Sequence, residues 1–216
     1  MDVNSDRLWE REALRLCDRY VNEVVLAFDL CPWAAPSLRA GRVARGVCLS
    51  VAPTPAECLP FVDGMAAPAA DGTYPDIGLL TFPRHAAGWA AFDGFAERVR
   101  RAMAEQRQPP GSPSAIAPRT GTFLVAAFHP DGAETFVGPH QLVSFLRRTP
   151  DPTLQFVRAE IIDRVKANQP DASEAVAVRN HENLRGAGAL RLQAVIAEIR
   201  ADRDISYARL AVPGLP

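Results

Sequence analysis

The stretch TGTFLVAAFHP, residues 120–130, decides the fold. It is the most hydrophobic of three segments that have the pattern of strands, and a proline ends it. A continuous apolar run of this length is typical of a strand that is buried on both faces. We therefore predict that it forms the central strand of a sheet and that His129 lies at its C-terminal end.

Two further strands are predicted upstream, and a helix follows each of them. Residues 42–52 alternate apolar and polar side chains, and DIGLLTFP forms the second strand at residues 76–83. The sequence TPAE, residues 54–57, has the form of a capping box with proline at the first helical position. Residues 85–106 carry an apolar face at helical spacing. Because parallel strands need such crossover helices, we expect an at least partly parallel sheet.

An N-terminal helix is predicted over residues 5–28, where apolar side chains recur at spacings of three and four. Pro32 disfavours helical geometry at Cys31, so the helix should end near Leu30. The sequence LCPWA at residues 30–34 therefore marks the exit from this helix.

The C-terminal part is predicted to be helical. Asp151 and Pro152 have the form of a helix cap and first residue, with Leu154, Val157, Ile161 and Val165 toward the core. Two more helices are expected over residues 172–185 and 189–203. The predicted fold class is α/β or α+β, with a small, partly parallel sheet of three to four strands, an N-terminal helix and a helical C-terminal segment.

Composition sets limits on the class of protein. The chain has 216 residues, 48% of them hydrophobic and 23% charged, with a formal net charge of −1. We expect one domain over residues 1–216, a surface loop rich in proline, glycine and serine at 107–120, and a helical extension at 170–216 that packs on the domain. The chain lacks the excess of basic residues that is typical of proteins that bind nucleic acid or an anionic membrane.

The N-terminus and the cysteines bear on the compartment. The chain is charged from its second residue and shows no apolar signal core. Its four cysteines show no CxxC spacing. We therefore expect a cytoplasmic protein with reduced thiols.

Four short blocks occur in an order found in a known family. They are LCPWA (30–34), AAFHPDG (126–132), RRTPDPTLQFVRAE (147–160) and VRNHENL (178–184). In these blocks the chain resembles an uncharacterised bacterial family, the domain of unknown function 1415 family, over residues 20–190. The blocks match at Cys31 and Pro32; at Phe128, His129, Pro130 and Asp131; at Arg148, Pro150, Pro152, Leu154 and Arg158; and at Arg179 and Asn180.

The chain departs from the family pattern at three positions where the family has a side chain that could take part in catalysis or binding. Gln155 stands where the family block HLLRE has its histidine, and Ala159 stands where that block has its glutamate. Gly132 replaces the tyrosine of HPDY. The chain is therefore identified as a divergent member, and the family resemblance implies no particular reaction.

His129 and Cys31 are the candidate catalytic residues. A histidine that leaves a hydrophobic strand can act as acid, base or metal ligand, although it can equally bond to local backbone. Thiolate is the reactive form of Cys31, and a helix C-terminus disfavours that charge. Cys31 should therefore be reactive only beside a cation or a metal, and otherwise it is a packed apolar residue. We expect His129 within reach of it.

Arg148 and Arg158 are the candidate anion-binding residues, and Trp33 and Gln155 complete the predicted binding set. Arg148 precedes the predicted helix at Pro152, where guanidinium and helix dipole together favour carboxylate or phosphate. Either arginine could instead pair with an internal carboxylate. Trp33 could also serve to anchor the helix exit against the core.

Three functions remain open from the sequence. The leading hypothesis is a small cytoplasmic enzyme acting on a small anionic molecule, with His129 as acid/base and Cys31 as nucleophile or ligand. The second is a protein in which Cys31 and His129 bind a metal or haem. The third is a non-catalytic binding or partner protein. No nucleotide-cofactor motif is present, and the sequence leaves substrate, reaction and oligomeric state open.

Overall fold

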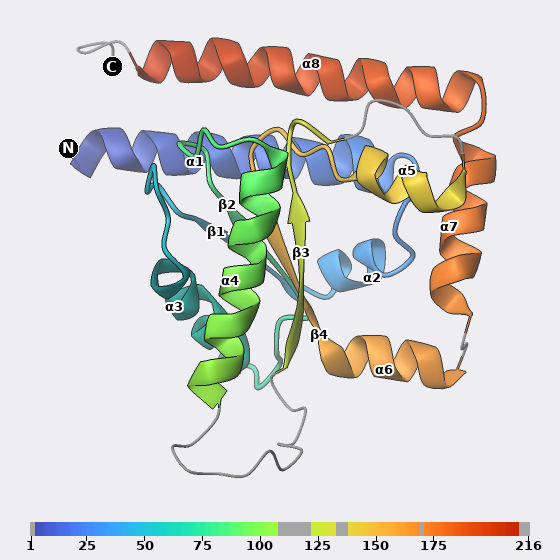
Figure 1. The fold of residues 1–216 in the computed structure, drawn as a ribbon, viewed down its shortest axis with the longest axis horizontal. Helices are drawn as coiled ribbons and strands as arrows, with labels where there is room; N and C mark the ends of the chain where they lie inside the picture. The colour runs from blue at the N-terminus through green and yellow to red at the C-terminus, as the bar shows by residue number, and fades with distance from the viewer. Residues whose placement is uncertain (1–2, 108–121, 133–137, 169–170, 212–216) are drawn as a thin grey trace.

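A computed structural model describes residues 3–107, 122–132, 138–168 and 171–211 (Figure 1). Its sheet has the order β1-β2-β4-β3. β1 is parallel to β2, while β4 is antiparallel to both β2 and β3. The predicted class is confirmed, since this is a mixed α/β fold with a partly parallel sheet. The strands are β1 (Val43–Val47), β2 (Ile77–Thr81), β3 (Phe123–Phe128) and β4 (Thr153–Arg158).

Helices precede, connect and follow the strands. The predicted surface loop at 107–120 lies, from residue 108 onward, outside the described residues. Within the described ranges, no helix has the length and apolar character needed to cross a membrane. The helices are α1 (Val3–Tyr20), the π-helical η1 (Val21–Leu26), α2 (Ala34–Arg39), α3 (Pro55–Ala66), α4 (Trp89–Arg107), α5 (Pro139–Leu146), α6 (Ala159–Asn168), α7 (Ala172–Asn183) and α8 (Ala187–Leu210).

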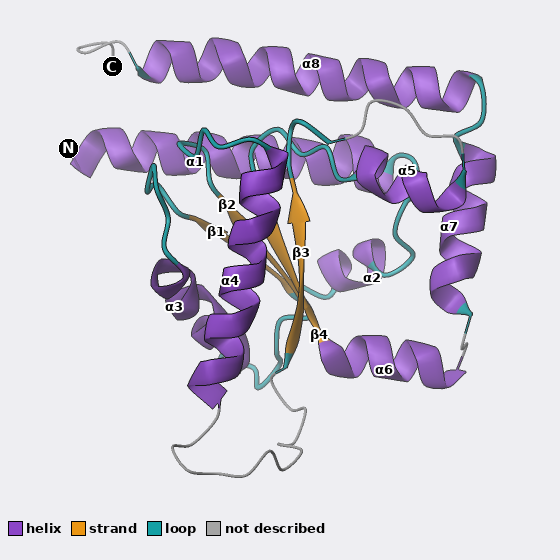
Figure 2. Ribbon diagram, in the orientation of Figure 1, coloured by secondary structure: helices purple, strands orange, loops and turns teal. Residues whose placement is uncertain are grey.

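The prediction that residues 120–130 form the central strand is wrong. Within the described part of the chain, β3 pairs only with β4, and Leu124 is 47% exposed. β3 is apolar because α4 lies beside it (Figure 2). Phe123 and Ala127 of β3 belong to the same core cluster as residues of α4. Arg100 of α4 also donates to the Val125 carbonyl at 3.2 and 3.1 Å. Because a helix covers it and an arginine caps it, this edge strand can be as hydrophobic as a central one.

The prediction of a helix starting at Asp151 and Pro152 is also wrong. Residues 153–158 form β4, which lies inside the sheet, and the helix starts only at Ala159. Leu154 and Phe156 are fully buried, and they alternate with residues that face the other side of the sheet. A short apolar run is compatible with the periodicity of a helix and with that of a strand. Here the segment forms a strand because it pairs with a strand on each side.

Helices cover both faces of the sheet. α3 and α4 enclose one core cluster with the sheet, while α1, η1, α5 and α8 build a second cluster together with Leu184, which follows α7. α8 runs antiparallel to α1, so both described ends of the chain lie on the same side (Figure 1). Arg15 and Arg19 of α1 pair with Asp202 of α8 at 2.8 and 2.5 Å, which fixes the alignment of these two helices.

The N-terminal helix ends earlier than its predicted end near Leu30. α1 widens into η1, and helical winding stops at Leu26. Asp29 then adopts a left-handed backbone with φ of 49°, a conformation that aspartate tolerates better than most residues. The chain turns there and presents Cys31 just before α2.

Candidate functional site

Two cavities adjoin residues 149–153, the segment that leads into β4. The first, which we call the polar cleft, has a volume of about 190 Å³. It occupies the carboxyl ends of β2 and β3, which run in the same direction on either side of β4. The carboxyl ends of strands are the position where open α/β sheets commonly bind ligands. Its lining residues are His85, Ala86, Ala87, His129, Pro130, Asp131, Pro150, Pro152, Arg200, Arg203 and Asp204.

His129 lines the polar cleft, but backbone groups occupy both of its ring nitrogens. Nδ1 accepts from the Asp131 amide at 3.1 Å, and Nε2 lies 2.9 Å from the Ala87 carbonyl. Since an amide only donates and a carbonyl only accepts, the ring is the neutral tautomer with its proton on Nε2. Burial lowers the pKa of His129, and the bond to Ala87 opposes this effect. His129 therefore joins two loops of the cleft wall.

The imidazole ring of His85 makes weaker hydrogen bonds to the described residues than the ring of His129 does. Its Nδ1 lies 3.4 Å from the Val51 carbonyl, which is a weak contact, and its buried Nε2 has no hydrogen-bond partner in the described part of the chain. The ring packs on Phe92 and Phe95. His85 therefore keeps a hydrogen-bonding group that the described residues do not satisfy.

Two arginines of α8 reach the polar cleft, and they differ in whether a described carboxylate pairs with their guanidinium group. Arg203 Nε pairs with the fully buried Asp151 at 2.6 Å, and its Nη1 pairs with Asp204 at 2.9 Å. Arg200 makes only a 3.4 Å contact to the Pro130 carbonyl among the described residues. Among the described residues, Arg200 therefore supplies a positive charge that no carboxylate pairs with directly.

Asp151 holds the cleft wall to α8. Its carboxylate accepts from Arg203 and from the Tyr207 hydroxyl at 2.7 Å. Burial raises the pKa of Asp151, while Arg203 and Tyr207 counteract that effect. The Asp151 carbonyl accepts from the hydroxyls of Thr149 and Thr153 at 2.7 and 2.9 Å. This bonding satisfies the buried carboxylate and its carbonyl, and it keeps residues 149–153 in place.

The second cavity, which we call the thiol cavity, has a volume of about 60 Å³ and lies between the sheet and the α1, η1 and α2 layer. Cys31 and Gln155 face it together, so the position of the family block's histidine opens toward Cys31. The lining residues are Cys17, Tyr20, Val21, Val25, Cys31, Ala34, Leu38, Val43, Ile77, Leu79, Phe128, Thr149, Thr153 and Gln155.

The electrostatic surroundings of Cys31 differ from the prediction. The residue does not only follow a helix; it also precedes α2, and the Ala34 amide donates to its backbone carbonyl at 3.1 Å. The Trp33 and Ala34 amides at this helix start act to lower the pKa of the Cys31 thiol, which the expected position at a helix C-terminus would not do. Burial nevertheless outweighs them and raises the pKa of the Cys31 thiol. The thiol is therefore protonated at neutral pH.

The blocks LCPWA and VRNHENL meet in the structure. Asn180 Nδ2 donates to the Leu30 carbonyl at 2.8 Å, and Arg179 donates to the Asp29 carbonyl at 2.8 Å. Asn180 is buried, and its Oδ1 has no hydrogen-bond partner among the described residues. These two side chains hold the helix exit in the conformation that presents Cys31 to its cavity.

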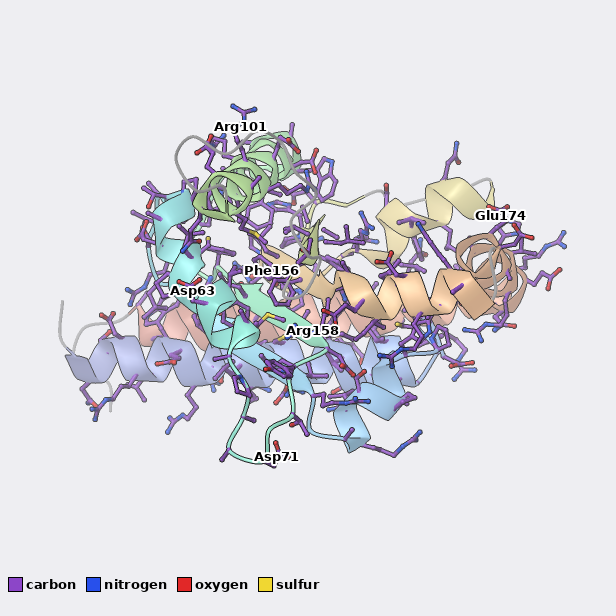
Figure 3. The ribbon with its side chains drawn as sticks, turned by 90° about the horizontal axis from the view of Figure 1, so that it is seen from below. Asp63, Asp71, Arg101, Phe156, Arg158 and Glu174 are labelled. Carbon is purple, nitrogen blue, oxygen red and sulfur yellow. The ribbon has the colours of Figure 1, made fainter. Side chains whose placement is uncertain are left out.

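The structure separates the remaining predicted site residues. Arg158, at the end of β4, donates to the backbone carbonyls of Pro75 and Met65 at 3.1 and 2.7 Å, deep in the molecule (Figure 3). Arg148 is buried, and its guanidinium lies 6.0 Å from the centre of the Phe145 ring. Trp33 is the N-cap of α2. None of these three side chains lines the polar cleft or the thiol cavity.

Gly132, a departure from the family pattern, lies against its neighbours too closely for a side chain. A Cβ there would lie 2.8 Å from both the Arg148 Cγ and the Ser144 carbonyl oxygen. The glycine therefore suits the close packing of the 130–132 turn on the end of α5.

Cys31 and His129 do not share a cavity: Cys31 lines the thiol cavity and His129 lines the polar cleft. Sequence reasoning missed His85, Arg200 and Arg203. A signal existed for His85, because both TFPRH and AFHP place a histidine just after a strand. The α8 arginines lie among many others on a long helix, and nothing local distinguishes them.

The fold and the cleft define a class: a mixed α/β protein with a polar cleft at the carboxyl ends of β2 and β3. The chain belongs to the DUF1415 family, whose model, described as a protein of unknown function, matches residues 12–194. No curated protein and no solved structure matches the chain.

Proposed function

We propose that the protein is an enzyme acting on a small anionic molecule that binds in the polar cleft. The observation that carries the proposal is the convergence of Arg200, His85 and His129 at the carboxyl ends of β2 and β3. Arg200 would bind the anionic group, since Asp151 and Asp204 already balance the charge of Arg203. The exposed carboxylates of Asp131 and Asp204 at the rim favour an anion that also carries a hydroxyl or amino group.

His85 is the proposed proton-transfer group. His129 would have to give up two backbone hydrogen bonds to exchange a proton, whereas His85 would give up one weak contact. A ligand hydroxyl could also bond to the Nε2 of His85, which has no hydrogen-bond partner within the described ranges. His129 is then a positioning residue that holds the Ala87 and Asp131 loops around the ligand.

Neither joint ligation of a metal or haem by Cys31 and His129 nor a Cys31–His129 catalytic pair forms part of the proposal. The two residues line different cavities. Among the described residues, no three histidine, cysteine, aspartate or glutamate side chains are grouped closely enough to hold a metal ion.

Nuclear magnetic resonance titration tests the binding step. The imidazole signals of His85 and His129 should shift saturably with members of a panel of small hydroxycarboxylates, amino acids and phosphate esters, and not with ethanolamine. Arg200→Gln should weaken binding about tenfold or more, because a charge-assisted bond is lost. Arg209→Gln, an exposed arginine on the same helix, is the matched control and should change nothing.

The catalytic step has its own test. An anion that binds should be converted when incubated with the protein, and His85→Gln should abolish the conversion while leaving binding within about threefold. If Arg200→Gln binds as well as the unmodified protein, the cleft assignment is wrong. If a bound anion of every panel class stays chemically unchanged, the protein is a binding protein and the enzymatic proposal fails.

A further inference from the structure

The thiol cavity lies on the other side of residues 149–153 from the polar cleft. We propose that it is a second binding site, which takes a small uncharged molecule, or an end group of that size, with an apolar body and one carbonyl or hydroxyl group. This proposal rests on the cavity alone and does not depend on the function proposed for the cleft.

The size of the cavity limits the ligand. The volume is about 60 Å³, and a water molecule needs about 10–15 Å³ of such space. The cavity therefore accommodates about four to six non-hydrogen atoms. It is formed where the sheet meets α1, η1 and α2, and Val21 and Val25 come from the π-helical turn. Such turns are frequent at functional sites, since they displace side chains from regular helical packing.

The lining excludes a charged ligand. None of the described residues that line the cavity carries a charge, and half of them are aliphatic. An ion would lose its hydration there without gaining a partner of opposite charge, which costs far more than the burial of apolar atoms can return.

The polar groups of the lining differ in how far the described part of the protein already satisfies them. The Tyr20 hydroxyl donates to the Leu146 carbonyl, and the hydroxyls of Thr149 and Thr153 donate to the Asp151 carbonyl. The Gln155 amide, by contrast, makes no hydrogen bond to the described part of the protein, and it lines the same cavity as the Cys31 thiol. A single carbonyl or hydroxyl on the ligand could bond to this amide, and the rest of the ligand would contact apolar side chains.

The test compares two probes of equal size, 2-butanone and propionate. Methyl signals of Val21, Val25, Leu38 and Ile77 should shift saturably with 2-butanone, and propionate should leave them unchanged. Methyls of Val62 and Val99, in the core cluster that α3 and α4 form on the other face of the sheet, serve as internal references. Absence of a saturable shift with 2-butanone, or equal binding of propionate, would overturn the proposal.

Two variants place the probe in the cavity. Ala34→Leu fills it and should abolish the 2-butanone shifts, whereas Ala90→Leu, at an exposed position of α4, should leave them intact. Gln155→Leu keeps the volume and removes the amide, so it should weaken 2-butanone about two- to tenfold. Should Ala34→Leu fail to fold, Gln155→Leu decides, because unchanged 2-butanone affinity in that variant contradicts the proposed selectivity.

Discussion

Residues 149–153 present alternate side chains to two different cavities. Pro150 and Pro152 face the polar cleft, while Thr149 and Thr153 face the thiol cavity. The same alternation occurs at the end of β3, where Phe128 lines the thiol cavity and the following His129 lines the polar cleft. An extended chain directs successive side chains to opposite sides, so one segment can serve two chemically distinct sites.

The two cavities differ in charge and in source. The polar cleft brings together two arginines, two histidines and two aspartates, largely from loops after strands and from α8. The thiol cavity is apolar and is built by α1, η1, α2 and one face of the sheet. The comparison shows that one short segment that leads into β4 can separate a charged site from an apolar one, provided that its own buried groups are satisfied. Asp151 is the group on which this condition depends.

The largest effect is expected for Asp151→Ala, which breaks the wall between the cavities. The variant leaves the Tyr207 hydroxyl and the Arg203 guanidinium without their buried acceptor, so the free energy of unfolding should fall by about 3 kcal/mol. Chemical denaturation measures it. Asp204→Ala removes an exposed partner of the same arginine and should cost less than about 0.5 kcal/mol. Equal losses for the two variants would contradict the assigned role of Asp151.

A smaller effect is expected on the thiol-cavity side for Asn180→Ala. The Leu30 carbonyl would lose its buried donor, so the free energy of unfolding should fall by about 1.5 kcal/mol. Alkylation of Cys31 should become faster, because the helix exit is less well held. Arg179→Ala is the comparison on the same loop, and it should cost less than about 1 kcal/mol because this side chain is more exposed. If Cys31 reacts no faster in either variant, Asn180 and Arg179 do not hold the helix exit in place.

On the polar-cleft side, His129 should impose a modest pH dependence on stability. Burial lowers the pKa of His129 in the folded protein, whereas the unfolded imidazole titrates near about 6.5. The unfolded state therefore binds the proton more readily, and stability should decrease as the pH falls from about 6.5 through the folded pKa of His129. Unfolding free energies between pH 8 and 5 measure the slope.

The control for this slope is a pair of histidine variants. His129→Gln should flatten the decrease, and His181→Gln, on α7, should retain it. The difference between unmodified protein and His129→Gln isolates this group from the buried Asp151, whose pKa is shifted in the opposite direction. A slope that is the same in all three proteins contradicts the tautomer and burial assigned to His129.

The smallest effect expected is none at all, and it tests the separation of the two cavities directly. Burial raises the pKa of the Cys31 thiol, so its alkylation should increase at higher pH than that of a free thiol. The same profile should hold in His129→Gln, since the imidazole lines the other cavity. Peptide mass mapping distinguishes Cys31 from Cys48. A Cys31 profile that moves to higher pH in His129→Gln would show that the two residues act as a pair.

Much of the fold could be predicted because it depends on local patterns. The capping box at Thr54 and Glu57, the strand at 76–83 and the position of His129 after its strand all depend on neighbours in sequence. The candidate site was predicted less well. Gln155 and Cys31 were predicted site residues, and they do share a cavity. His129, in contrast, bonds to backbone groups, and Arg158 donates to buried backbone carbonyls. Contacts with backbone carbonyls leave no trace in residue type or spacing.

The sequence alone determined the order of helices and strands over most of the chain, and the placement of a histidine and a cysteine where elements end. Periodicity and capping are sufficient for this, because they act over a few residues. Only the tertiary structure decided that β4 inserts between β2 and β3, that α8 brings Arg200 and Arg203 to the cleft, and that Cys31 and His129 lie in separate cavities. These outcomes depend on packing between segments far apart in the chain, where hydrogen-bond satisfaction and burial outweigh local preference.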